Sequence, residues 1–200
     1  MDECGNQFGY YIVKATMKTV PYPEEAREIV VPLPQPYTIE SEAKVIVWLS
    51  KKVKGDILEI GCAQGFLTKA LAKYNPDKVI YALDWSFNQS LSVHQESERP
   101  DVVASRALHL PNVIAINGNS RIFNYPVGTD FVLIDGDHSD EGVMADSRKA
   151  LSHNPTLIVW HDYRPESQWM GVARLLDKWS EGGMDLVQIE GTPIVVKGWL

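Results

Sequence analysis

Two short clusters of ionisable side chains follow two apolar runs in the second half of the sequence. The first spans Asp135 to His138 and the second spans His161 to Tyr163. Carboxylate oxygens suit Mg²⁺ or Mn²⁺, and an added imidazole shifts the preference toward Mn²⁺, iron or Zn²⁺. The two clusters therefore predict a divalent metal site formed by Asp135, His161 and Asp162. The alternative is that the two aspartates cap the following helices or pair with Arg164.

A glycine-containing turn lies in the first half of the sequence, in the segment Glu59-Ile60-Gly61-Cys62-Ala63-Gln64-Gly65. Glycines at these positions let the backbone turn sharply and approach a ligand. The segment fails the dinucleotide fingerprint G-x-G-x-x-G, because Ala63 and Phe66 stand at its second and third glycine positions. A nicotinamide-dependent oxidoreductase is therefore disfavoured. The alternative is that the glycines only form a tight turn between a strand and a helix.

A carboxylate ends the next apolar run. Asp84 follows Val79-Ile80-Tyr81-Ala82-Leu83, and a carboxylate at this place can accept hydrogen bonds from two ribose hydroxyls. Trp85 comes directly after it, and its ring either packs on an adenine face or belongs to the core. The turn and Asp84 together favour a nucleoside-containing cofactor.

The elements that must position these residues alternate between strands and helices. Buried strands are predicted at 56–60, 79–83, 113–116, 131–134 and 157–160, helices at 41–54, 66–74 and 168–179, and a closing hairpin at 186–197. Right-handed crossovers place helices on both faces of a parallel sheet. We predict an α/β, Rossmann-like, doubly wound and mostly parallel seven-stranded sheet with a C-terminal antiparallel hairpin. Ligands bind such sheets beyond the carboxyl ends of the strands.

Glu59-x-Gly61-x-x-x-Gly65 followed by Asp84 resembles the cofactor signature of class I S-adenosylmethionine-dependent methyltransferases. The resemblance implies that the glycine turn lies beside the methionine moiety, that Asp84 holds the ribose, and that Asn119 and Ser120 line the adenine. Ala63 departs from the glycine that many members carry. The cofactor-binding residues implied are Glu59, Gly61, Cys62, Ala63, Gly65, Asp84, Trp85, Asn119, Ser120 and Asp135.

The stretch from Phe131 to Tyr163 resembles methyltransferase family 24 and is similar to the metal-dependent catechol and caffeoyl-CoA O-methyltransferases. The resemblance implies that Asp135 and an acidic pair after the fifth strand hold a divalent ion, Mg²⁺ or Mn²⁺. It also implies that His138, three places after Asp135, is the catalytic base, which suits a side chain that titrates near neutrality. His161 stands where the family carries an acidic residue. Glu40 is interpreted as a capping carboxylate.

Composition favours one globular domain over residues 1–200, of which 1–37 form an extended segment or lid. The net charge of −7 and the lack of a basic run argue against a nucleic-acid partner. Two cysteines, no export signal and no long apolar run favour a cytoplasmic protein without a membrane partner. A homodimer stays open as an alternative to a monomer.

The sequence therefore predicts an S-adenosylmethionine-dependent O-methyltransferase acting on a small-molecule hydroxyl, with Asp135 and His138 as catalytic residues and with metal assistance. The alternative is a non-catalytic protein that keeps the fold for binding or interaction. That alternative predicts cofactor binding without turnover, or no binding at all.

Overall fold

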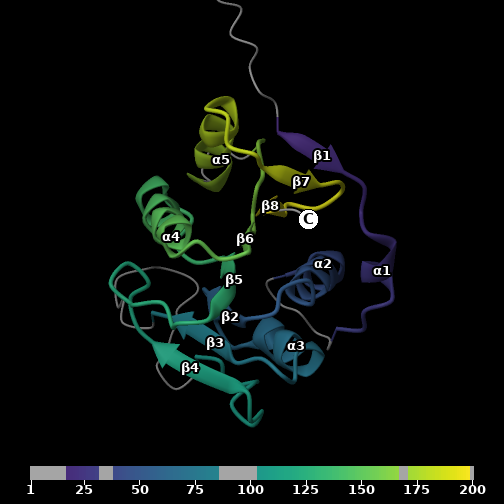
Figure 1. The fold of residues 1–200 in the computed structure, drawn as a ribbon, viewed down its shortest axis with the longest axis vertical. Coiled ribbons are helices and arrows are strands. Elements are labelled where there is room, and N and C mark those ends of the chain that lie inside the picture. Colours follow the sequence, from purple (N-terminus) through teal and green to yellow (C-terminus); the bar gives the residue numbers. More distant parts are fainter. Residues whose placement is uncertain (1–16, 32–37, 86–102, 167–170, 199–200) are drawn as a thin grey trace, which may run out of the picture.

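The computed structural model describes residues 17–31, 38–85, 103–166 and 171–198 of the chain (Figure 1). Most of these residues belong to one sheet and the helices around it. The helices are α1 (Glu24–Arg27), α2 (Glu40–Ser50), α3 (Phe66–Tyr74), α4 (Asp140–His153) and α5 (Gly171–Glu181). The strands are β1 (Lys18–Val20), β2 (Asp56–Ile60), β3 (Ile80–Asp84), β4 (Val113–Asn117), β5 (Thr129–Ile134), β6 (Leu157–Trp160), β7 (Val187–Ile189) and β8 (Val195–Lys197).

The strands form one sheet in the order β1-β7-β8-β6-β5-β2-β3-β4. β8 runs antiparallel to both of its neighbours, and the other pairings are parallel. The mostly parallel sheet and the closing hairpin are therefore confirmed. After β2 the chain builds outward through β3 and β4, and it then returns to place β5 on the other side of β2. This reversal lies between β2 and β5, where doubly wound sheets bind ligands.

The predicted count of seven strands was wrong by one. Lys18–Val20 adds β1 in parallel to the outer edge of β7. Its three residues are too few to show an alternating pattern, and its pairing depends on an edge more than 160 residues away in the sequence. The N-terminal segment thus contributes an edge strand and the short helix α1. Residues 1–16 and 32–37 lie outside the described part, so the lid remains a prediction.

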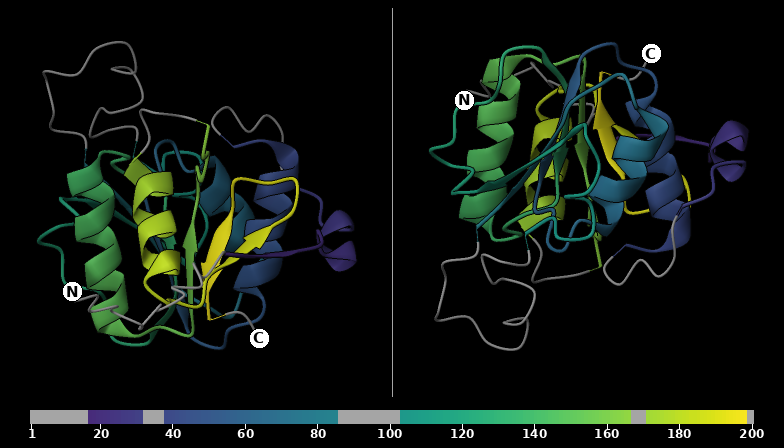
Figure 2. Two further views of the ribbon diagram at one scale, coloured as in Figure 1. Left: turned by 90° about the horizontal axis from the view of Figure 1, so that it is seen from above. Right: turned by 90° about the horizontal axis from the view of Figure 1, so that it is seen from below.

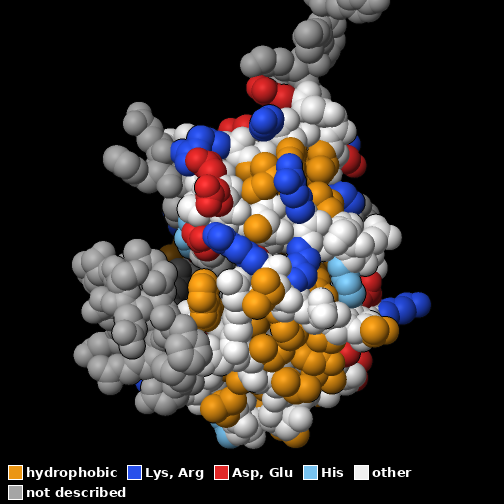
Figure 3. Space-filling view, turned by 90° about the vertical axis from the view of Figure 1, so that its left-hand side faces the viewer, with side chains coloured by type: hydrophobic (Ala, Val, Ile, Leu, Met, Phe, Trp, Pro, Cys, Tyr) orange, Lys and Arg blue, Asp and Glu red, His pale blue; other side chains and the backbone are white. Residues whose placement is uncertain are grey.

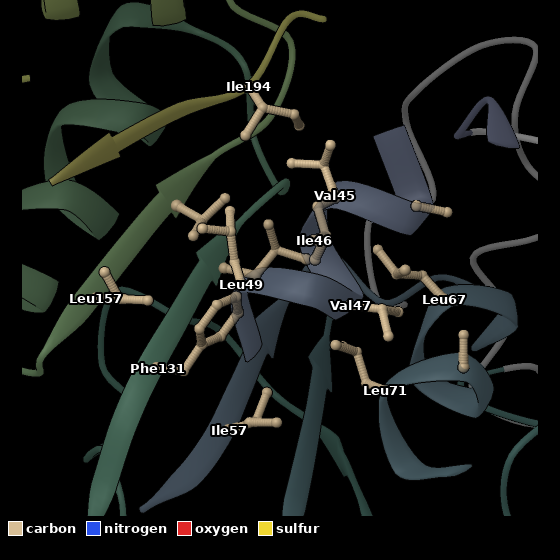
Figure 4. Packing of buried hydrophobic residues seen from close by; sticks show 14 of the residues in the cluster. Val45, Ile46, Val47, Leu49, Ile57, Leu67, Leu71, Phe131, Leu157 and Ile194 are labelled. Atoms are coloured by element: carbon tan, nitrogen blue, oxygen red, sulfur yellow. The ribbon is translucent and has the colours of Figure 1, made fainter. Parts of the chain in front are cut away.

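Helices cover both faces of the sheet (Figure 2). Alternate residues of each strand point to opposite faces, so that Phe131 and Leu133 of β5 pack toward α2 and α3, whereas Val132 and Ile134 pack toward α4 and α5. Figure 4 shows the first of these cores, where side chains of α2 meet those of α3 and the strands. Because both faces of the central strand β6 are buried, Leu157–Trp160 is a continuous apolar run.

Two helix predictions need correction. The first helix begins at Glu40 and ends at Ser50, whereas Ser41 to Lys54 was predicted, and its N-cap residue is Ile39. α4 had not been assigned, although Ser139 caps it by accepting a hydrogen bond from the Gly142 N–H and Asn154 ends it in the left-handed region. The helix predicted at 66–74 is confirmed, and the one predicted at 168–179 is observed over Gly171–Glu181.

β4 is the outer strand at one end of the sheet. Ile114 on β4 and Ile122 and Val127 in the loop that follows are exposed. Figure 3 shows apolar side chains gathered on the lower part of this side of the molecule.

Among the described residues, no helix is long and apolar enough to cross a membrane.

Candidate active site

The glycine turn after β2 lies against the loop after β5. Gly61 has φ +89°, and a Cβ on it would come within 2.0 Å of the Asp135 carbonyl oxygen. Gly65 has φ +79° and precedes the first residue of α3. These two positions require glycine, because a side chain would meet backbone in each case. Ala63 also adopts a positive φ, 44°. The turn therefore brings backbone to the point where the strand order reverses.

Asp84 holds this turn from the end of β3. Its Oδ2 accepts a hydrogen bond from the Ala63 N–H at 2.6 Å, and its Oδ1 accepts one from the Trp85 N–H at 2.7 Å. Burial raises the pKa of Asp84, and the two N–H donors oppose that shift. Each carboxylate oxygen has two lone pairs, so both can accept a further hydrogen bond from a ligand hydroxyl. Trp85 is 47% exposed, so about half of its side chain is open to solvent or to a ligand.

Glu59 lies beneath the turn and is buried. Its Oε2 accepts a hydrogen bond from the Thr68 hydroxyl at 2.5 Å. Burial raises the pKa of Glu59 to about 8, against the opposing effect of Thr68, with Asp135 and Asp84 adding to the rise. Cys62 is buried beside it, and burial likewise raises the pKa of its thiol. Both residues support the turn from inside the fold.

The raised pKa of Glu59 makes the folded state lose stability as pH rises. The unfolded carboxyl ionises near 4.5, whereas the folded one holds its proton to about 8. Between these values the folded state binds more protons, so the free energy of unfolding falls by up to about 1.4 kcal/mol per pH unit. Glu59→Gln, which keeps an acceptor for Thr68, should remove this contribution and make the fall from pH 5 to 8 in urea titrations shallower by up to that amount. The exposed Glu190→Gln should leave it unchanged, and an equal slope in parent and Glu59→Gln would refute the assignment.

The segment after β4 approaches the loop after β5 from the other side. The Asn119 side chain accepts a hydrogen bond from the Arg121 N–H at 2.9 Å, which shapes the turn, and Ser120 is partly buried. Arg121 forms an ion pair with Asp137 at 2.8 Å. Asn119 and Ser120 therefore lie in a loop that is tied to the loop containing Asp135.

Two histidines and two aspartates alternate in a ring at the ends of β5 and β6. His138 Nε2 lies 3.4 Å from Asp135 Oδ1 and 3.3 Å from Asp162 Oδ2. His161 Nδ1 lies 3.1 Å and 3.2 Å from the same two oxygens. The structure thus brings together the sequence-predicted metal residues and the predicted base. The capping alternative is wrong for Asp135, because Ser139 caps α4.

The sequence left open whether Asp162 is a metal ligand or pairs with Arg164, and its two oxygens allow both. Its Oδ1 accepts a hydrogen bond from Arg164 at 3.1 Å, while its Oδ2 faces the two histidines. Asp162 also has φ +59°, in a region that non-glycine residues rarely adopt. Such backbone conformations cluster at functional sites.

Glu42, in the first turn of α2, is a site residue that the sequence analysis did not identify. Its Oε2 lies 2.9 Å from His161 Nε2 and accepts a hydrogen bond from the Ile39 N–H at 3.1 Å. Arg164 approaches the other oxygen at 3.7 Å. The sequence contained a signal for this residue. Glu42 lies on the same face of α2 as Ile46 and Leu49, which packs into the core, and a buried carboxylate there needs a polar partner.

The carboxylates dominate the electrostatics of the ring. Burial lowers the pKa of His161, but Asp135, Asp162 and Glu42 outweigh it and raise the value to about 12. Burial also lowers the pKa of His138, and Asp135 and Asp162 again produce a net rise. Burial raises the pKa of Asp162, but the histidines bring it down to about 2. The carboxylates therefore favour the protonated, positively charged form of both imidazoles, and a metal ion that binds His161 would have to replace its proton.

The donor set fits a divalent cation. The ligand atoms of Asp135, His161 and Asp162 lie within 4.8 Å of one another, so one ion could contact all three. Two carboxylates and one imidazole suit Mn²⁺, iron or Zn²⁺ better than Mg²⁺. The second nitrogen of His161 faces a carboxylate, as is usual for metal-bound histidine. Binding would release the Nδ1 proton.

The solved structures that this chain resembles include three methyltransferases or cofactor-bound proteins of similar length. Cofactor-bound Rv0187 from MTB has a TM-score of 0.58 at 20% identity, with 82% of each chain covered. The SAH-bound Podospora anserina methyltransferase PaMTH1 has a TM-score of 0.56 at 16% identity, covering 82% of this chain and 80% of that one. The O-methyltransferase TomG from Streptomyces achromogenes, in complex with SAM, has 0.53 at 18%, covering 82% and 81%. Neither the protein-family models nor the curated proteins contain a match.

The chain therefore has the Rossmann-like fold of class I S-adenosylmethionine-dependent methyltransferases, and the resemblance seen in the sequence is confirmed at the level of the fold. The narrower likeness to methyltransferase family 24 is not specifically confirmed.

Proposed function

We propose that this protein is an S-adenosylmethionine-dependent O-methyltransferase that acts on a small-molecule hydroxyl with the help of a divalent cation. The observation that carries the proposal is the position of Asp135. Its backbone meets Gly61 of the cofactor turn, and its side chain belongs to the histidine–aspartate ring. The turn proposed to bind the cofactor and the ring proposed to bind the acceptor are thus neighbours at the point where the strand order reverses.

S-adenosylmethionine supplies an electrophilic methyl group on a sulfonium. The glycine turn and Asp84 hold the cofactor, and the loop with Asn119 and Ser120 borders its adenine. His138 takes the proton of the acceptor hydroxyl at Nε2, and the oxygen then forms a bond to the methyl carbon as the carbon–sulfur bond breaks in line. Alignment and deprotonation are the chain's contribution to the rate.

Asp135, His161 and Asp162 would hold the cation, which in such sites lowers the pKa of a bound hydroxyl and orients it. Asp135 Oδ1 and Asp162 Oδ2 lie 3.4 and 3.3 Å from His138 Nε2, so the two carboxylates would stabilise the imidazolium that forms when Nε2 takes the proton. The residues expected to select the substrate are 87–106 and 164–169, of which 87–102 and 167–169 lie outside the described residues.

A non-catalytic binding protein is the competing proposal. It explains the fold, but it does not explain why His138 and Asp135 keep their places beside the predicted cofactor turn. Titration calorimetry of the intact chain with S-adenosylmethionine and S-adenosylhomocysteine, each with and without Mg²⁺ or Mn²⁺, separates the two. Binding of both nucleosides, followed by methyl transfer to members of a panel of hydroxyl compounds, supports the enzyme. No binding of either nucleoside overturns it.

A further inference from the structure

His161 is held at both ring nitrogens by carboxylates from two different parts of the fold. Nδ1 faces Asp135 and Asp162 at the strand ends, at 3.1 and 3.2 Å, while Nε2 faces Glu42 of α2 at 2.9 Å. The side chains of His161 and Glu42 are each only 2% exposed. A helix packed against one face of the sheet therefore places a buried carboxylate behind the ring of charged groups.

This contact determines which nitrogen faces the ring. An ionised carboxylate only accepts hydrogen bonds, so Nε2 must carry a proton toward Glu42. In a neutral imidazole the lone pair then lies on Nδ1, on the side of Asp135 and Asp162. Glu42 is itself fixed, because the Ile39 N–H donates to the same oxygen and Arg164 lies near the other. Rotation of the imidazole would break these contacts in a buried place.

We infer that Glu42 is the positioning residue that presents His161 Nδ1 as a ligand atom, and that the site consequently takes Mn²⁺ in preference to Mg²⁺. The inference rests on the proposed function only in assigning the bound metal a part in methyl transfer. The effect of Glu42 on metal binding itself does not depend on that function. A nitrogen ligand suits Mn²⁺ more than Mg²⁺, which prefers oxygen ligands and retains its waters. A carboxylate behind a ligating histidine fixes its tautomer and raises its basicity.

Mn²⁺ binding to the full chain, without nucleoside or acceptor, tests the inference. Electron paramagnetic resonance of free Mn²⁺ gives its Kd, and competition with Mg²⁺ gives the preference. The parent should bind Mn²⁺ at least about tenfold more tightly than Mg²⁺. Glu42→Ala should weaken Mn²⁺ binding by about 10- to 100-fold, the effect typical of residues behind a metal ligand. Glu42→Gln, which keeps an acceptor oxygen for Nε2, should recover part of the loss.

Glu40→Gln is the matched control. Glu40 lies in the same turn of α2, but its side chain is half exposed and pairs with Lys44, away from the ring. This variant should bind Mn²⁺ like the parent. Because Glu42→Ala could fail to fold, S-adenosylhomocysteine affinity and circular dichroism are measured on each variant, and Glu42→Gln carries the test if alanine unfolds the chain.

His161→Asn distinguishes positioning from a general structural effect. Its amide oxygen can replace Nδ1 as a ligand but does not reach Glu42, so the preference for Mn²⁺ should fall and Glu42→Gln should have no further effect in this background. An equal loss from Glu42→Gln with and without His161 would overturn the inference. So would unaltered Mn²⁺ affinity in Glu42→Ala, or a parent that binds S-adenosylhomocysteine but not Mn²⁺. The last result leaves S-adenosylmethionine-dependent methyl transfer standing but removes the divalent cation from the proposed function. A parent that binds neither S-adenosylhomocysteine nor Mn²⁺ overturns both the inference and the proposed function.

Discussion

Replacing His138 with alanine should lower kcat by about 10²- to 10⁴-fold and leave the Kd for S-adenosylmethionine close to that of the parent, because general-base catalysis contributes about this much. His138 faces Asp135 and Asp162 through Nε2, and its side chain has no hydrogen bond or ion pair with the glycine turn among the described residues. Turnover is measured as S-adenosylhomocysteine release with an accepting hydroxyl compound, and affinity by calorimetry. A large loss of cofactor affinity would contradict the assignment of His138 as the base.

The pH profile gives a second readout for His138. Burial lowers its pKa, but Asp135 and Asp162 raise it above the ordinary 6.5. The base must be neutral to accept a proton, so kcat/KM should rise as pH increases through this raised pKa and should be small below 6.5. His138→Gln should remove this rise. An unchanged acid limb in His138→Gln would place the titrating group elsewhere.

The central sheet was predictable because its strands are buried on both faces. Runs such as Leu157–Trp160 contain only apolar side chains, and their ends coincide with polar clusters. β1 escaped prediction because its three residues depend on a distant edge strand. α4 was missed although Ser139 and Asn154 are ordinary end signals, because Asp140 to His153 is polar and contains Gly142. Local patterns identify strong elements, whereas tertiary pairing decides the weak ones.

The site was predictable to the same degree. Asp135, His138, His161 and Asp162 emerge from adjacent parallel strands, so their convergence follows from sheet topology. Glu42 could not be placed by such an argument, because its contact with His161 depends on how α2 packs across the sheet. Glu40, two residues earlier in the same helix, pairs with Lys44 on the surface. A carboxylate on the apolar stripe of a helix, such as Glu42, indicates a buried polar partner.

Replacing Asp84 with alanine should weaken S-adenosylhomocysteine binding by about 100-fold or more, since each hydrogen bond to a charged group contributes about 1.5–3 kcal/mol. Two ribose hydroxyls would lose the carboxylate that accepts their hydrogen bonds. The Ala63 N–H, which donates to Asp84 Oδ2 at 2.6 Å, would also lose its acceptor. Calorimetry measures the loss. Asp185→Ala is the control, because that residue is exposed and pairs only with Lys18 among its described contacts.

Loosening of the turn alone would also weaken binding in Asp84→Ala, so the ligand is varied as well. The 2′-deoxyribose analogue of S-adenosylhomocysteine lacks one of the two hydroxyls that are expected to donate hydrogen bonds to Asp84. In the parent the analogue should bind about tenfold or more weakly than S-adenosylhomocysteine, and in Asp84→Ala the two ligands should bind alike, because the carboxylate that distinguishes them is gone. If the variant still discriminates between the ligands as strongly as the parent does, another residue holds the ribose and the role of Asp84 is confined to the turn.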